Sequence, residues 1–320
     1  MPEMKPALVL VRGDRLGDVV VSSSILEPIL KRYGQTHEII WSVKKEYLPL
    51  FAGLGGVKSV AMEELPGFLE GKPPGTAIFL NPAPVLECRW RALGEFYGWG
   101  KTLPDERKKC RIPEIQELAN LLKASGFPIY ESSQPWIAPL QPLPIVNLPQ
   151  KPYVIIHISA FEQKPTLTAK TILGLTDDLQ KMGNSVVWVG LENRRDSDWL
   201  GEMSGGLKVI AFEKLSILEL YAVLKSAKGV IGRDSGVTHL SAAIGIPTVA
   251  VVGPLAKVKA AARWSPMGPC SRALEFDIAP RFWEGYLSYQ KRYFESVKPK
   301  DVVEELKTLW RCQTATESQE

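Results

Sequence analysis

The sequence predicts an α/β protein built from two doubly wound domains in tandem. Short apolar runs without polar alternation are typical of strands buried in a parallel sheet. Amphipathic stretches of helical period follow these runs, and the alternation begins again after a proline-rich segment. Because parallel sheets bind ligands at the carboxyl ends of their strands, we expect the functional residues there.

The first domain is predicted to span residues 1–134. It opens on the apolar run "ALVLV", which leads through a glycine-containing loop into a helix that ends near Gly34. The other elements expected in this domain are strands over residues 37–43 and 76–82 and a helix over residues 113–127.

An extended connector is predicted over residues 135–152. Proline occupies positions 135, 139, 142, 144, 149 and 152. This density excludes a helix or a central strand, because proline lacks the backbone N–H that both need. We place the domain boundary in this segment.

The second domain is predicted over residues 153–298, where strands and helices alternate regularly. The expected strands cover residues 153–159, 185–190, 207–212, 228–232 and 247–253, and the expected helices cover 167–183, 192–205, 216–227 and 236–245. A closing helix over residues 299–312 is expected to pack back towards the N-terminal domain. The polar tail, residues 313–320, is expected to be disordered.

Composition narrows the function classes. The 320 residues carry a formal charge of +4, which suits an acidic ligand or an anionic membrane surface but falls short of a dedicated nucleic-acid binder. The four cysteines are widely spaced, so neither a zinc site nor a disulfide framework is indicated, and a reducing cytoplasm is the simplest location.

No apolar run is long enough for a signal-peptide core or a membrane span. Membrane contact is therefore expected to be peripheral, at the cytoplasmic face. Basic residues that could make it are Lys44, Lys45, Arg89, Arg91 and the run 106–111. A solvated surface is the simpler interpretation of each of these clusters.

Familiar nucleotide and metal motifs are missing from the sequence. It contains neither the dinucleotide pattern G-x-G-x-x-G nor the phosphate loop G-x-x-x-x-G-K-[ST]. A single D-x-D, residues 196–198, lies near a predicted helix start and not at a strand end. The three histidines are dispersed, which argues against a histidine-rich metal centre.

A predicted strand-to-helix turn, "GRDSGVTHL", is the strongest candidate site. The first amides of a helix lack internal acceptors, so together with the helix dipole they attract an anion. Gly236 would let a phosphate come close, and Thr238 and His239 could contact it. The alternative is that Asp234 or Ser235 only caps the helix and His239 is a satisfied polar residue.

Two stretches carry a resemblance to a known family. "RDSGVTHLSAAIGIPTVAVVGP" and "LVRGDRLGDVVVSSSILEPIL" resemble the two signatures of glycosyltransferase family 9, which includes the bacterial lipopolysaccharide heptosyltransferases. The resemblance covers most of the chain. It implies the GT-B fold, with two Rossmann-like domains facing across a cleft, the first binding the acceptor and the second the sugar nucleotide.

The resemblance implies an inverting, metal-independent transfer of a hexosyl or heptosyl group. Heptose from ADP-heptose is the expected donor, a lipopolysaccharide-core or related glycan the expected acceptor, and no further cofactor is needed. Asp18 matches the general base of the family, and Asp14 is the second candidate. Asp18 could instead be only a helix cap.

The resemblance also implies the remaining site residues. The donor diphosphate would be bound by Asp234, Ser235, Gly236, Thr238 and His239, and by Lys164, for which Lys170 is the alternative. Glu192 would meet the ribose or serve only as a helix acid. Arg15, Arg89 and Arg91 are the acceptor candidates. Ser24 stands where the family often has proline.

Two other functions stay open. A sugar-nucleotide 2-epimerase of the same fold also uses an Asp-Ser-Gly turn, but such enzymes continue with a second glycine and a glutamate where this chain has Val237 and His239. A non-catalytic member would bind a sugar nucleotide or a glycan without transfer. In each case we expect a monomer that binds no nucleic acid.

Overall fold

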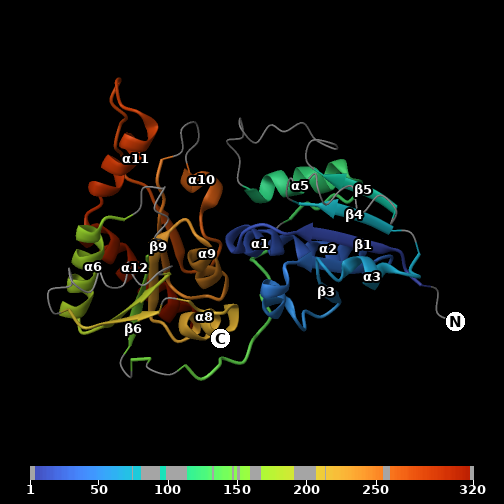
Figure 1. Cartoon of the computed structure of the whole chain (residues 1–320), viewed down its shortest axis with the longest axis horizontal. Coiled ribbons are helices and arrows are strands. Elements are labelled where there is room, and N and C mark those ends of the chain that lie inside the picture. Colours follow the sequence, from blue (N-terminus) through green and yellow to red (C-terminus); the bar gives the residue numbers. More distant parts are fainter. Residues whose placement is uncertain are drawn as a thin grey trace. The chain divides into compact units, whose positions relative to one another are not determined.

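The computed structural model describes residues 4–73, 75–80, 94–98, 114–131, 133–145, 148–149, 152–158, 167–190, 207–212, 214–254 and 260–317. The chain forms two compact units, Met1–Leu140 and Gln141–Glu320 (Figure 1). Their boundary falls within the predicted connector, residues 135–152.

The first unit contains a five-stranded parallel sheet in the order β3-β2-β1-β4-β5. Its strands are β1 (Ala7–Arg12), β2 (Glu38–Val43), β3 (Val57–Ala61), β4 (Gly75–Phe79) and β5 (Gly94–Gly98). Every residue of β1 is buried, because a central parallel strand is covered on both faces. The other elements are η2 (Lys45–Phe51), α3 (Leu65–Leu69) and α5 (Glu114–Ala124).

The predicted first helix is broken into three pieces, α1 (Leu16–Ser22), η1 (Ser23–Ile25) and α2 (Leu26–Tyr33). The hydroxyls of Ser23 and Ser24 each donate to a backbone carbonyl three residues earlier at 2.7 Å. The carbonyl of Ser24 accepts from the backbone N–H of Ser133 at 3.1 Å. These bonds compete with the helical ladder and explain the break.

The second unit contains a six-stranded parallel sheet in the order β11-β10-β9-β6-β7-β8. Its strands are β6 (Tyr153–His157), β7 (Ser185–Val189), β8 (Val209–Phe212), β9 (Gly229–Arg233), β10 (Thr248–Val251) and β11 (Ser271–Leu274). The five predicted strands are confirmed, and β11 was not predicted.

Helices cover both faces of the second sheet, with α6 and α12 on one side and α8 and α9 on the other (Figure 1). The helices are α6 (Ala169–Lys181), α8 (Ile217–Lys225), α9 (Gly236–Ala243), α10 (Ala260–Trp264), α11 (Tyr286–Glu295) and α12 (Pro299–Glu317). Sequence-local caps start two of them: Thr168 caps α6, and Ser216 with Glu219 forms a capping box on α8. The predicted helix 192–205 lies outside the described residues.

The closing helix is longer than predicted. It runs to Glu317, so the tail predicted to be disordered from residue 313 begins in helix. Its apolar face lies in the core of the second unit and contacts α6, β9 and β10. The buried residues of this face are Val302, Val303, Leu306 and Leu309. The expected return of this helix to the N-terminal domain stays a prediction.

Two of the widely spaced cysteines meet in the fold. Cys270 and Cys312 are free thiols, and burial together with a hydrogen bond to Cys312 raises the pKa of Cys270 to about 12. Cys88 and Cys110 lie outside the described residues. Within the part of the chain that is described, no helix has the length and apolarity to cross a bilayer.

In each sheet, successive strands are added on one side of the first strand and then, from one point on, on its other side. The first sheet grows from β1 through β2 to β3 and then restarts at β4, beside β1. The second grows from β6 through β7 to β8 and then restarts at β9, beside β6. Such switch points open a crevice at the carboxyl ends of the two central strands, so candidate sites are sought there.

Candidate functional site

Arg12, the last residue of β1, lies at the switch point of the first sheet. Its Nε is 2.7 Å from Asp14 Oδ1, its Nη2 is 3.1 Å from Asp18 Oδ1 and its Nη1 is 3.3 Å from Glu114 Oε1. Nη1 also donates to the carbonyl of Leu80, just after β4, at 2.5 Å. One guanidinium therefore ties together β1, β4, α1 and α5.

The guanidinium of this cluster is buried. The side chain of Arg12 is 4% exposed, and among the described residues it pairs with three carboxylates. Charges interact more strongly away from water, so each carboxylate is held in place by the same guanidinium.

The position and exposure of Asp18 suit a general base. It is the third residue of α1, whose N-cap is Arg15 with extended backbone and no capping side chain, so the alternative that Asp18 is the cap is wrong. Its side chain is 18% exposed, against 31% for Asp14. A carboxylate that a guanidinium holds in place and that is still partly accessible can accept a proton from a bound hydroxyl.

Two residues of this cluster were not predicted. A charged residue ending a buried apolar strand was a signal for Arg12. Nothing in the pattern could identify Glu114, because its separation from Arg12 is 102 residues and it begins an ordinary amphipathic helix.

At the switch point of the second sheet, His157 ends β6 and links it to the turn after β9. Its Nδ1 lies 3.1 Å from Ser235 Oγ. Two glycines leave room for the ring: a Cβ on Gly190, where φ is +93°, would lie 2.6 Å from Nε2, and one on Gly232 would lie 3.0 Å from His157 Cβ. The glycines that end β7 and interrupt β9 therefore make space for the buried imidazole.

His157 is held in its neutral form. Burial, reinforced by the nearby charge of Arg233, lowers its pKa from 6.5 to about 4. The neutral ring can share a hydrogen bond with the Ser235 hydroxyl, whereas a second charge here would face Arg233 unscreened. Sequence reasoning gave this histidine no role.

Acid should destabilise the protein through His157. The imidazole of His157 has a pKa near 6.5 in the unfolded chain and about 4 in the native protein. Between pH 6.5 and 4 the unfolded chain therefore binds a proton that the native protein does not bind. The contribution of His157 to stability is thus complete above pH 6.5 and is lost as the pH falls towards 4. The loss attributable to this residue is about 3 kcal/mol. His157→Gln should flatten that part of the profile of urea midpoint against pH. His37→Gln is the comparison variant and should flatten it less, because burial also lowers the pKa of the half-buried His37, but no neighbouring charge adds to the effect. An unchanged profile would contradict the assignment.

Side chains at the start of α9 form hydrogen bonds within the turn itself. Ser235 caps the helix and accepts from the N–H of Thr238 at 3.4 Å. Thr238 is fully buried, and its Oγ1 donates to the carbonyl of Arg233 at 2.7 Å. This hydroxyl therefore shapes the turn and does not face a ligand. The backbone N–H groups of Gly236 and Val237 have no acceptor within the helix, so they are the groups of this turn that can donate to an anion.

His239 also points inward. It is 3% exposed, and its Nε2 lies 3.0 Å from Asp234 Oδ1. Its Nδ1 is buried without a partner among the described residues, which fits a lone pair when Nε2 carries the proton towards Asp234. The expected contact between His239 and a phosphate is not what this geometry favours. The pair instead fixes the carboxylate of Asp234, which stays 38% exposed.

Arg233, the last residue of β9, supplies the positive charge of this site. Its Cζ lies 4.8 Å from the centre of the Phe294 ring, and within the described chain its buried Nε has no hydrogen-bond acceptor. Burial lowers its pKa, and only the opposing charge of Asp234 raises it. Arg233 comes three residues before the first residue of α9, and a guanidinium together with the free amides of a helix start can bind an anion.

Six predicted site residues remain to be placed. Lys164, Glu192, Arg89 and Arg91 lie outside the described residues. Lys170 is exposed in the first turn of α6, and Arg15 is exposed at the start of α1.

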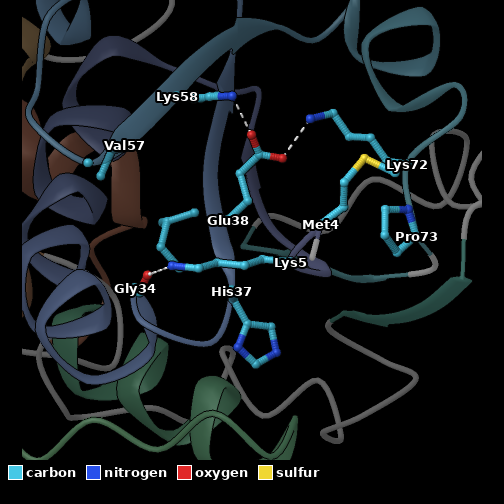
Figure 2. A pocket seen from close by; sticks show the side chains of 11 residues that line it. Met4, Lys5, Gly34, His37, Glu38, Val57, Lys58, Lys72 and Pro73 are labelled. Carbon is cyan, nitrogen blue, oxygen red and sulfur yellow. Dashed lines mark hydrogen bonds and ion pairs between the residues drawn. The ribbon is translucent and has the colours of Figure 1, made fainter. Parts of the chain in front are cut away.

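A pocket of about 640 Å³ opens at the amino edge of the first sheet, the edge opposite Arg12. Figure 2 shows Glu38 reaching between Lys58 and Lys72, with Lys72 at 2.6 Å, while Lys5 donates to the carbonyl of Gly34 at 2.9 Å. Burial alone would raise the pKa of Glu38, but these two lysines lower it. Three lysines and one glutamate line the pocket, which leaves it with a net positive charge. Because it opens at the edge of the sheet opposite Arg12, it is not part of the candidate site.

Comparison with known proteins identifies the family of the chain. A model of glycosyltransferase family 9 (heptosyltransferase) matches residues 100–279, more than half of the chain. No curated protein matches the sequence at a significant level.

Solved structures match over nearly the whole chain. A glycosyltransferase family 9 protein from Veillonella parvula has a TM-score of 0.68 at 16% identity, covering 97% of this chain and 98% of that one. The E. coli ADP-heptose lipopolysaccharide heptosyltransferase II has 0.66 at 18%, covering 95% and 98%. The E. coli heptosyltransferase WaaC with ADP has 0.65 at 15%, covering 95% and 99%. These likenesses confirm the GT-B fold.

Proposed function

Because the chain belongs to glycosyltransferase family 9, we propose that it is an inverting enzyme that transfers heptose from ADP-heptose to a lipopolysaccharide-core or related glycan, without a metal ion. The observation that carries this proposal is the second switch point, where Arg233 ends β9 three residues before the first residue of α9.

The donor diphosphate is assigned to this turn. Its oxygens accept from the N–H groups of Gly236 and Val237, where the helix dipole adds positive potential. The guanidinium of Arg233 provides the charge that a metal ion would otherwise supply. The exposed carboxylate of Asp234, fixed by His239, is placed to accept from a donor hydroxyl. Lys164 or Lys170, together with Glu192, stays proposed from the family resemblance.

The reaction is a single displacement. Asp18 takes the proton of the acceptor hydroxyl while the oxygen attacks the anomeric carbon of the sugar. The bond from that carbon to the diphosphate breaks, and the nucleoside diphosphate leaves with the electron pair. Arg233 and the α9 amides stabilise the charge on the leaving group. Arg12 acts as a positioning residue, because it holds Asp18 and does not touch the substrates.

The choice of ADP rests on relatives. WaaC was solved with ADP, and heptosyltransferase II is described as using ADP-heptose. For the acceptor, we propose that Arg15, Arg89 and Arg91 meet anionic groups of the glycan. An acceptor carried by a lipid places the enzyme at the cytoplasmic face of a membrane.

A panel of nucleotide diphosphates and nucleotide sugars, assayed without metal by calorimetry, tests the donor assignment. ADP is expected to bind most tightly, and Arg233→Met should weaken it by about 10- to 100-fold, as for loss of a charged hydrogen bond. Lys225→Met, an exposed change on α8, is the control. If a uridine sugar alone bound and was epimerised, the epimerase function would replace this proposal.

A further inference from the structure

The loop before α11 and the first turn of that helix expose four large apolar side chains. Phe282 is 101% exposed, Trp283 82%, Leu287 63% and Tyr286 39%. We call residues 281–287 the aromatic tip. In Figure 1 this segment extends away from the strands of the second sheet, beyond the label of α11.

The aromatic tip is held by an ordered base. Arg292 grips Glu284 through two bonds, Nε to Oε1 at 2.9 Å and Nη2 to Oε2 at 2.6 Å. Arg292 also donates to the carbonyl of Ala279 at 2.8 Å, and Tyr289 donates to that of Ile278 at 2.7 Å. The exposure of the rings is therefore imposed by the structure beneath them.

One exposed cation, Arg281, stands next to the rings of the aromatic tip. Glu284 is the one carboxylate among residues 281–287, and the hydrogen bonds and charge of Arg292 pair it and lower its pKa to about 2. Lys291, on α11, is 77% exposed and lies 4.0 Å from Glu295, so its charge is partly matched. The acidic Glu275 and Asp277 lie near Tyr289, at the base. Apolar rings beside a cation match an anionic lipid surface.

The size of this surface argues against a protein partner. The exposed surface of four side chains, two of them only partly exposed, is smaller than the about 800 Å² that each partner of a stable protein complex buries. A short convex projection ending in tryptophan and phenylalanine fits the bilayer interface, where aromatic rings are stable at headgroup depth.

We propose that the aromatic tip inserts into the headgroup region of an anionic membrane, with Phe282 and Trp283 as the inserting side chains and Arg281 on the lipid phosphates. Docking of this kind requires neither donor nor acceptor, so it can be measured without any transfer activity. A failure of the proposed transfer reaction would leave it standing.

Vesicle sedimentation tests the proposal. The full-length protein is expected to bind phosphatidylglycerol–phosphatidylcholine vesicles more tightly than pure phosphatidylcholine vesicles. The double variant Phe282→Ser, Trp283→Ser should lose about tenfold or more in partitioning, the effect of exposing one buried aromatic side chain to water. Arg281→Glu should weaken binding to the anionic vesicles only. Tyr130→Ser, at a 77% exposed tyrosine of the other unit, is the matched control.

The melting temperature and ADP affinity of each variant show that it is folded. Equal partitioning of the wild type and the double variant would overturn the proposal, as would absence of wild-type binding to anionic vesicles. If sedimentation without lipid showed wild-type dimers and monomeric double variants, the occupant of the tip would be a second copy, and the membrane assignment would fall.

Discussion

Asp18→Asn is expected to lower the turnover number by about 10²- to 10⁴-fold, the usual contribution of a positioned general base. The amide keeps the size of the side chain but cannot take up the acceptor proton. Donor affinity should be unchanged, because the diphosphate is assigned to Arg233 and α9. Steady-state kinetics with ADP-heptose and a purified glycan acceptor, with ADP affinity measured separately, separate the two effects.

Asp14→Asn is the matched control, since Asp14 pairs with the same guanidinium at 2.7 Å. It should cost much less activity than Asp18→Asn. The reverse order would move the base to Asp14, the second candidate. Full activity of both variants would rule out this chemistry, and binding without turnover in the wild type would favour a non-catalytic member.

Arg12→Met should destabilise the first unit by about 3–5 kcal/mol, the cost of breaking a buried ion pair from one side. The change leaves Asp14, Asp18 and Glu114 close together without their common cation. The carbonyl of Leu80 also loses its donor. Urea unfolding followed by fluorescence measures the loss, and the turnover number should fall as well because Asp18 is no longer held.

The double variant Arg12→Met, Glu114→Met provides the control. It removes one of the orphaned charges, so it should be more stable than Arg12→Met alone, with a coupling visible in a double-mutant cycle. The stability of Arg12→Lys should lie between those of the wild type and Arg12→Met, because an ammonium group cannot bind several carboxylates in the fork geometry of a guanidinium. Simple additivity of the two single changes would show that the pair at 3.3 Å contributes little.

Part of this organisation could be predicted from local pattern. The runs 7–11 and 153–156 are apolar throughout, because strands at the centre of a parallel sheet are buried on both faces. Glycine and charged residues follow the runs 7–11 and 228–232 and marked the ends of these strands. They therefore indicated the carboxyl edge of each sheet, where Asp18 lies in the first unit and Ser235 in the second. The short strands β3, β5 and β11 were missed, since each has a charged residue within it (VKSVA, GEFYG and SRAL) and shows no continuous apolar run.

The site itself could be predicted only in part. The hydroxyl of Thr238 and the ring of His239 were expected to face a ligand, but the turn directs both inward. Side-chain direction in a cap depends on hydrogen bonds that spacing does not encode. Arg233 and His157 owe their roles to the pairing of β9 with β6, which brings distant segments together. Such contacts follow from topology and not from local sequence.

The position of α12 bears on how the protein is made. Its residues Val302 to Leu309 complete the core beneath β9 and β10, so the second unit cannot close until nearly the whole chain has left the ribosome. The first unit has all its strands long before that. A nonsense codon ahead of position 302 should therefore yield a folded amino-terminal half joined to an open, protease-sensitive remainder.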